Sequence, residues 1–98
     1  MLETFSLATF SDLLDDDFHV DLDGGASVDL RLAEASRAGL PQQPGGREPF
    51  SLLFRGPGAP ILPQRIYAVE HAGLGAFDIF LVPLTPDEGG GRYEAVFA

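Results

Sequence analysis

From residue 18 onward, apolar and polar side chains alternate along the chain. Phe18, Val20 and Leu22 are separated by His19 and Asp21, and the same alternation recurs in later segments. Successive side chains of a β-strand point to opposite faces of a sheet, so this period predicts strands that each bury one face. The alternation therefore favours a sheet whose buried side chains form one core.

Clusters of glycine and proline separate the alternating segments and mark turns. One example is the Asp23-Gly24-Gly25 stretch, because glycine readily adopts the positive φ that a tight hairpin needs. The predicted fold class is mostly β, a small antiparallel barrel or rolled sheet, since closure removes exposed strand edges. An open sheet crossed by a helix is the alternative. We expect a single domain over 1–98, with strands at about 18–23, 27–34, 49–55, 65–71, 76–83 and 92–97.

A short helix is expected before the strands, at about 5–14. Four apolar side chains recur there at helical spacing and form one face: Leu7, Phe10, Leu13 and Leu14. Ser6 is placed to cap the first turn. The aspartates at 15–17 should lie beyond the helix in solvent, because carboxylates are unfavourable at the negative end of a helix dipole.

The charge balance is strongly acidic, with a formal net charge of −9. All six basic residues are arginine. Nucleic acids and anionic membranes are bound through positive patches, so we expect neither as a partner. The chain contains no cysteine, which excludes disulfides. No secretion signal and no run of about 18 apolar residues is present, so we expect a cytoplasmic protein.

Patterns typical of catalytic or metal sites are missing. The only histidines, His19 and His71, have no cysteine partners, and no serine lies in a nucleophile-elbow motif. The aspartates between positions 15 and 23 do not follow the spacing of a calcium-binding loop. We therefore expect a non-enzyme without catalytic residues, metal or cofactor. His71 is expected to point outward at a hairpin, or to place a ring nitrogen on a loop carbonyl.

The fifth predicted strand is apolar on both faces after Asp78. Its Phe80 and Val82 therefore belong to a face that another element or a second molecule must cover. In so small a domain, a leftover apolar surface often marks a contact. This favours a non-enzymatic interaction or assembly module, with a protein partner or a homo-oligomer.

A small-ligand-binding β-barrel is the alternative function. Tyr67, Tyr93 and Arg55 would then line the mouth of the barrel. A barrel of six strands is mostly filled by its own side chains, which ranks this function second. Arg55 is also expected to form a two-pronged pair with a carboxylate, the candidates being Glu48, Glu70 and Glu94.

Residues 48–97 also carry a series of short motifs. They are Glu48–Pro57 (EPFSLLFRGP), Leu62–Gln64, Tyr67, Glu70–His71, Leu74–Gly75, Phe80–Pro83 and Arg92–Phe97. Together they resemble an uncharacterised bacterial family, domain of unknown function 6916, and residues 7–18 are similar more loosely. The resemblance implies a stand-alone domain with no assigned activity and no catalytic residue to carry over. It also implies a link to phage tail-like proteins.

Overall fold

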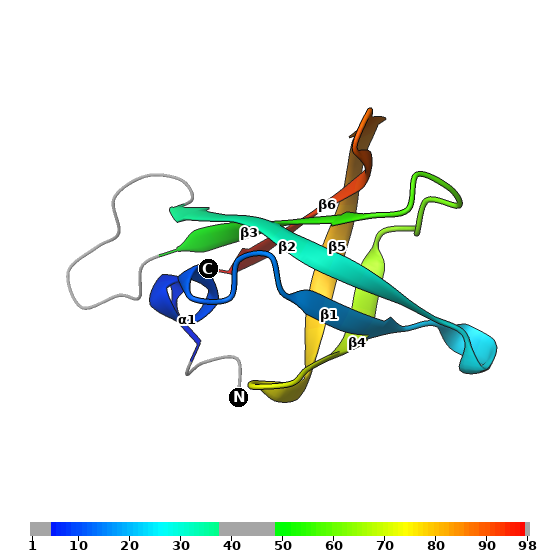
Figure 1. Cartoon of the computed structure of the whole chain (residues 1–98). Helices are drawn as coiled ribbons and strands as arrows, with labels where there is room; N and C mark the ends of the chain where they lie inside the picture. Colours follow the sequence, from blue (N-terminus) through cyan, green and yellow to red (C-terminus); the bar gives the residue numbers. More distant parts are fainter. Residues whose placement is uncertain (1–4, 38–48, 98) are drawn as a thin grey trace.

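The computed structural model describes residues 5–37 and 49–97. Figure 1 shows a strongly curved sheet with a short helix at one end. The helix and strands are, in chain order, α1 (Leu7–Ser11), β1 (Asp17–Asp21), β2 (Ser27–Arg37), β3 (Phe50–Gly56), β4 (Arg65–His71), β5 (Gly75–Asp87) and β6 (Gly90–Phe97). A single 3₁₀ turn, Asp23–Gly25, joins β1 to β2. Both of its glycines have positive φ, which confirms the predicted glycine turn.

The strands close into a barrel in the order β1-β2-β3-β6-β5-β4. Every pair of neighbouring strands in the described residues is antiparallel. The predicted antiparallel barrel with one short helix is therefore confirmed, and the open-sheet alternative is wrong.

Closure is incomplete between β5 and β6. From Gly75 to Leu81, β5 pairs with β4. Its ladder with β6 begins only at the pair formed by Val82 and Glu94 and runs to Asp87 and Gly90. Beyond this ladder the two strands diverge toward the end of the barrel that holds α1 (Figure 1). In the described part of the chain, the first half of β5 thus has a ladder partner on one edge only.

The alternating pattern places every second strand residue in the core. Burying an apolar side chain of this size stabilises a fold by about 1.5–3 kcal/mol, so the alternation dominates the stability. The buried apolar residues are Phe5, Phe10, Phe18, Val20, Leu30, Leu32, Phe50, Leu52, Phe54, Tyr67, Val69, Phe77, Ile79, Leu81, Tyr93 and Ala95.

Helix α1 is shorter than predicted. Ser6 caps it as expected, because its hydroxyl accepts from the Thr9 N–H and the Thr9 hydroxyl accepts from the Ser6 N–H. The prediction of helix over 5–14 is wrong beyond Ser11. There the backbone turns to join β2, with the Asp15 N–H donating to the Leu32 carbonyl at 2.7 Å. No helix within 5–37 and 49–97 is long and apolar enough to cross a membrane.

The turn after α1 also changes which side chains are buried. Leu14, expected on the apolar helix face, is 44% exposed, whereas Phe10 is fully buried. The Phe10 ring centroid lies 6.4 Å from that of Phe77 on β5 and 5.5 Å from that of Phe97 on β6. Phe10 therefore spans the two strands where they have no ladder between them.

The β5–β6 hairpin is longer than predicted. The strands expected at 76–83 and 92–97 are joined by a two-residue turn, because β5 continues to Asp87 and β6 begins at Gly90. A side chain at Gly90 would meet the Gly56 carbonyl oxygen at 2.5 Å, and its φ is +108°. Glycine is therefore required where this hairpin passes the end of β3. Strand β2 likewise extends past the predicted end at 34, to Arg37.

Replacing Phe10 by alanine should destabilise the domain by about 3–5 kcal/mol, the usual range for a buried phenylalanine. The substitution would leave a cavity between β5 and β6, where no backbone ladder joins the two strands. Leu14→Ala is the control and should change stability by about 0.5 kcal/mol or less, since Leu14 is exposed. Urea unfolding measures both, and equal losses would contradict the role assigned to Phe10.

Candidate functional site

The predicted barrel mouth is closed by the chain itself. Tyr67 and Tyr93 are both 1% exposed. The Tyr67 hydroxyl donates to the Pro63 carbonyl at 2.5 Å, and the Tyr93 hydroxyl accepts from the Leu62 N–H at 2.8 Å. Burial raises the pKa of the Tyr67 hydroxyl, which keeps it a neutral donor. The two tyrosines hold the proline-rich loop between β3 and β4 over this end.

Arg55 lies near the same end and forms the expected two-pronged pair with a different residue. Its two terminal nitrogens donate to Asp87 at 2.7 and 2.9 Å. The predicted partners Glu70 and Glu94 are wrong, and Glu48 lies outside the described residues. The Arg55 guanidinium, with the Gly89 N–H, holds the pKa of Asp87 well below its usual range. This pair ties β3 to the β5–β6 hairpin, which extends further than the sequence suggested.

His71 lies inward, which corrects both sequence expectations for it. Its Nδ1 accepts from the N–H groups of Gly73 (2.9 Å) and Leu74 (3.2 Å), so it cannot also donate to a carbonyl. The proton then resides on Nε2, which donates to Asp16 at 2.9 Å. The ring also packs on Phe18, with centroids 4.6 Å apart. Nδ1 therefore holds the β4–β5 turn, and Nε2 ties that turn to Asp16 in the connection between α1 and β1.

An exposed apolar row crosses the outside of β4, β5 and β6. Ile66 is 61% exposed, Phe80 47% and Val96 60%. Ile66 pairs with Phe80 across β4 and β5, and Val96 of β6 lines the same cleft as these two side chains. Val82, half-buried and one row further along β5, adjoins the row.

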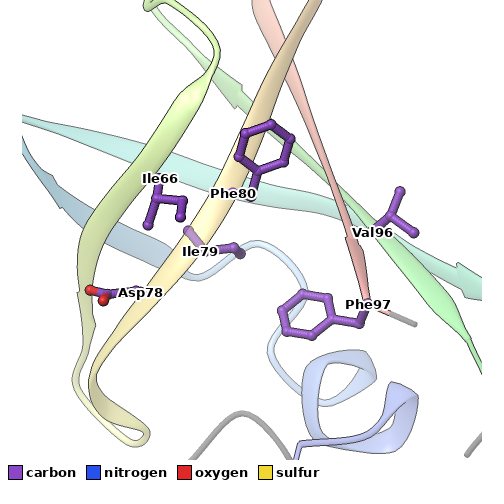
Figure 2. A pocket seen from close by; sticks show the side chains of 6 residues that line it. All are labelled: Ile66, Asp78, Ile79, Phe80, Val96 and Phe97. Atoms are coloured by element: carbon purple, nitrogen blue, oxygen red, sulfur yellow. The ribbon is translucent and has the colours of Figure 1, made fainter.

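A cleft of about 220 Å³ lies along this row, lined by Ile66, Asp78, Ile79, Phe80, Val96 and Phe97. Figure 2 shows β5 and β6 diverging here, with Phe97 between them and Ile66 and Phe80 beside each other. The cleft is therefore the outer side of the incompletely closed seam, above the point that Phe10 fills from inside.

Carboxylates continue the same outer face toward β1. Asp78 is two residues from Phe80 on the same side of β5 and lines the cleft. On β4, Glu70 lies opposite His19 of β1, which in turn lies opposite Asp29 of β2. The surface thus changes from apolar at the cleft to acidic over β4, β1 and β2.

Arginines neutralise other parts of the surface. Arg31 pairs with Asp15 at 3.0 Å, and Arg65 pairs with Asp23 at 3.0 Å. Arg55 and Arg92 both approach Asp87, at 2.7 and 3.8 Å. Within the described residues, none of these pairs includes Asp78 or Glu70, so the acidic face beside the cleft keeps its charge.

The sequence pointed to Phe80 and Val82 but missed Ile66 and Val96. Both missed residues occupy outward positions of strands in which inward and outward residues alternate. The alternation could therefore have identified them as exposed apolar side chains. Their meeting with Phe80 depends on the register of three strands, and the sequence alone does not specify that register.

A family model described as Domain of unknown function (DUF6916) matches residues 5–97. The match covers α1 and every described strand, well beyond the region from Glu48 onward that carries the motifs. No curated protein and no solved structure matches the chain. The description of the family names no activity, ligand or partner.

Replacing His71 by alanine should cost about 1–3 kcal/mol of stability, because two partly buried turn N–H groups lose their acceptor. His19→Ala is the matched control. His19 is exposed and solvent screens its ion pairs with Asp21 and Asp29, so its replacement should cost less stability. Chemical denaturation measures both variants, and a smaller loss for His71→Ala than for His19→Ala would contradict this account.

The pKa of His19 should lie above its ordinary value of 6.5, because Asp29 accepts a hydrogen bond from the ring and stabilises its charged form. A raised folded-state pKa gives stability that is complete below the unfolded-state pKa and is lost as pH rises through the folded-state value. NMR titration of the ring should show this elevation, and Asp29→Asn should reduce it. An unchanged pKa in Asp29→Asn would contradict the assignment.

Proposed function

Because the chain belongs to the family of domain of unknown function 6916, for which no activity is described, we propose a function from the surface of the barrel. The domain is a non-enzymatic interaction or assembly module. It binds a protein partner through the cleft between β5 and β6.

The exposed row of Ile66, Phe80 and Val96 carries this proposal. Single exposed apolar residues are common on soluble proteins, but a contiguous group on one face typically marks a contact. Here three large side chains from three strands are aligned beside a cleft, and each is about half exposed or more. Covering them would remove apolar area from water at about 25 cal/mol per Å².

The small-ligand alternative has less support. Ligand pockets usually enclose about 300–1,000 Å³. Two apolar cavities of the described residues are smaller, at about 220 Å³ beside Phe80 and about 180 Å³ beneath the loop at Pro60. Two larger hollows, of about 440 Å³ beside His19 and about 350 Å³ beside Asp78, are wider open to solvent and more polar than the enclosed apolar pockets typical of ligand sites. The hydroxyls of Tyr67 and Tyr93 are already engaged by the loop at Pro60.

The cellular location of the partner and the assembly that contains it stay predictions. A bacterial cytoplasm and a phage tail-like assembly are the expectations drawn from the sequence and the family resemblance. These expectations indicate which proteins to test as partners, and the cleft is the surface that such a partner would contact.

A photo-cross-linking amino acid at position 80 should capture a specific protein in the source cells. The same amino acid at position 14 is the control, because Leu14 and Phe80 have similar exposure, 44% and 47%. The captured protein is then purified and its affinity for the domain measured. Phe80→Asp should weaken binding about tenfold or more, equivalent to about 1.4 kcal/mol, and Leu14→Asp should not.

Two results would overturn the proposed function. One is capture of no specific protein at position 80. The other is an affinity for the captured protein that Phe80→Asp and Leu14→Asp reduce equally.

A further inference from the structure

Taking the proposed function as its basis, we propose how the partner binds. The partner supplies an extended segment that adds as a strand to the open edge of β5 beside Phe80. The segment carries lysine or arginine where it passes Asp78.

The open edge follows from the strand pairing. In a strand, successive residues direct their N–H and C=O groups to opposite edges. Between Phe77 and Leu81, the groups that point away from β4 meet no ladder partner on β6, whose pairing with β5 begins at Val82. Within residues 5–37 and 49–97, no loop supplies a backbone hydrogen bond to this stretch either. Unpaired strand edges are templates for an added strand.

The side chains around the edge define what such a strand would carry. A residue of the added strand level with Phe80 on the outer face would contact the apolar row. A residue two positions away would lie level with Asp78. Side chains of the opposite face would point toward Phe97, which lines the cleft. The matching segment is apolar on its inner face and has one apolar and one basic residue on its outer face.

Charge favours a different protein over a second copy of this chain. Each copy carries a formal net charge of −9. Pairing two copies at the cleft would bring the Asp78 side chains and the adjacent acidic faces together, which is repulsive. A basic segment instead meets carboxylates, Asp78 among them, that form no arginine pair within residues 5–37 and 49–97.

The test uses the intact domain and a capped synthetic peptide, Lys-Val-Lys-Val-Leu-Val-Thr. Two control peptides accompany it, one with glutamate in place of lysine and one with N-methyl groups on alternate backbone amides. Fluorescence anisotropy should show the lysine peptide binding at least about tenfold more tightly than either control. Hydrogen exchange should slow at the amides of 77–81 when the lysine peptide is bound.

Variants of the domain locate the peptide. Phe80→Asp and Val96→Asp should each weaken binding of the lysine peptide about tenfold or more. Asp78→Asn should weaken it about two- to fivefold, the range of an exposed ion pair. Leu14→Asp and Asp12→Asn, at exposed sites on the α1 side, should leave the affinity unchanged.

The outcomes separate this inference from the proposed function. Equal binding of the lysine and N-methylated peptides would overturn strand addition, and equal binding of the lysine and glutamate peptides would overturn the basic partner. Concentration-dependent dimerisation abolished by Phe80→Asp would show a second copy as the occupant and would also overturn the basic partner. In each case a cross-link specific to position 80 would leave the interaction surface intact.

Discussion

Closure of the barrel between β5 and β6 depends on the packing of the Phe10 ring. This ring packs against β5 and β6 where those strands separate, with centroids 6.4 Å from Phe77 and 5.5 Å from Phe97. It also lies 5.8 Å from Phe50 on β3 and 6.3 Å from Phe18 on β1, so one side chain of α1 joins four strands. Aromatic pairs at such distances add about 0.5–1.5 kcal/mol beyond their burial. Side-chain packing thus replaces the backbone ladder that would otherwise complete the wall.

The same replacement creates the proposed binding surface. Because Phe10 fills the seam from inside, β5 and β6 can remain apart on the outside without exposing the core. Their unpaired edges and the side chains of Ile66, Phe80 and Val96 face solvent there. The packing of Phe10 therefore explains both how the core is closed and why strand edges stay exposed at the proposed binding surface.

Among the described residues, the arginine–aspartate pairs lie on parts of the surface other than the cleft. Arg55 and Arg65 each hold distant segments together, through Asp87 and Asp23. Such exposed pairs stabilise a fold only modestly. Their larger consequence is spatial. Arg55, Arg65 and Arg92 contact aspartates at hairpins, whereas Asp78 and Glu70 beside the cleft form no ion pair with an arginine among the described residues. With a formal net charge of −9 and with Arg31, Arg55, Arg65 and Arg92 paired to aspartates, the chain presents a surface suited to a basic partner.

The sequence by itself determined the strands, the Gly24-Gly25 turn and the identity of most core residues, because each depends on neighbours close in the chain. It also indicated Phe80 as an outward apolar residue. Only the tertiary structure decided that Arg55 pairs with Asp87, that His71 turns inward, and that Ile66 and Val96 join Phe80. These contacts depend on strand register and on the length of the β5–β6 hairpin. A shift of one residue would reverse every side chain of a strand, and local patterns contain no measure of that shift between distant segments.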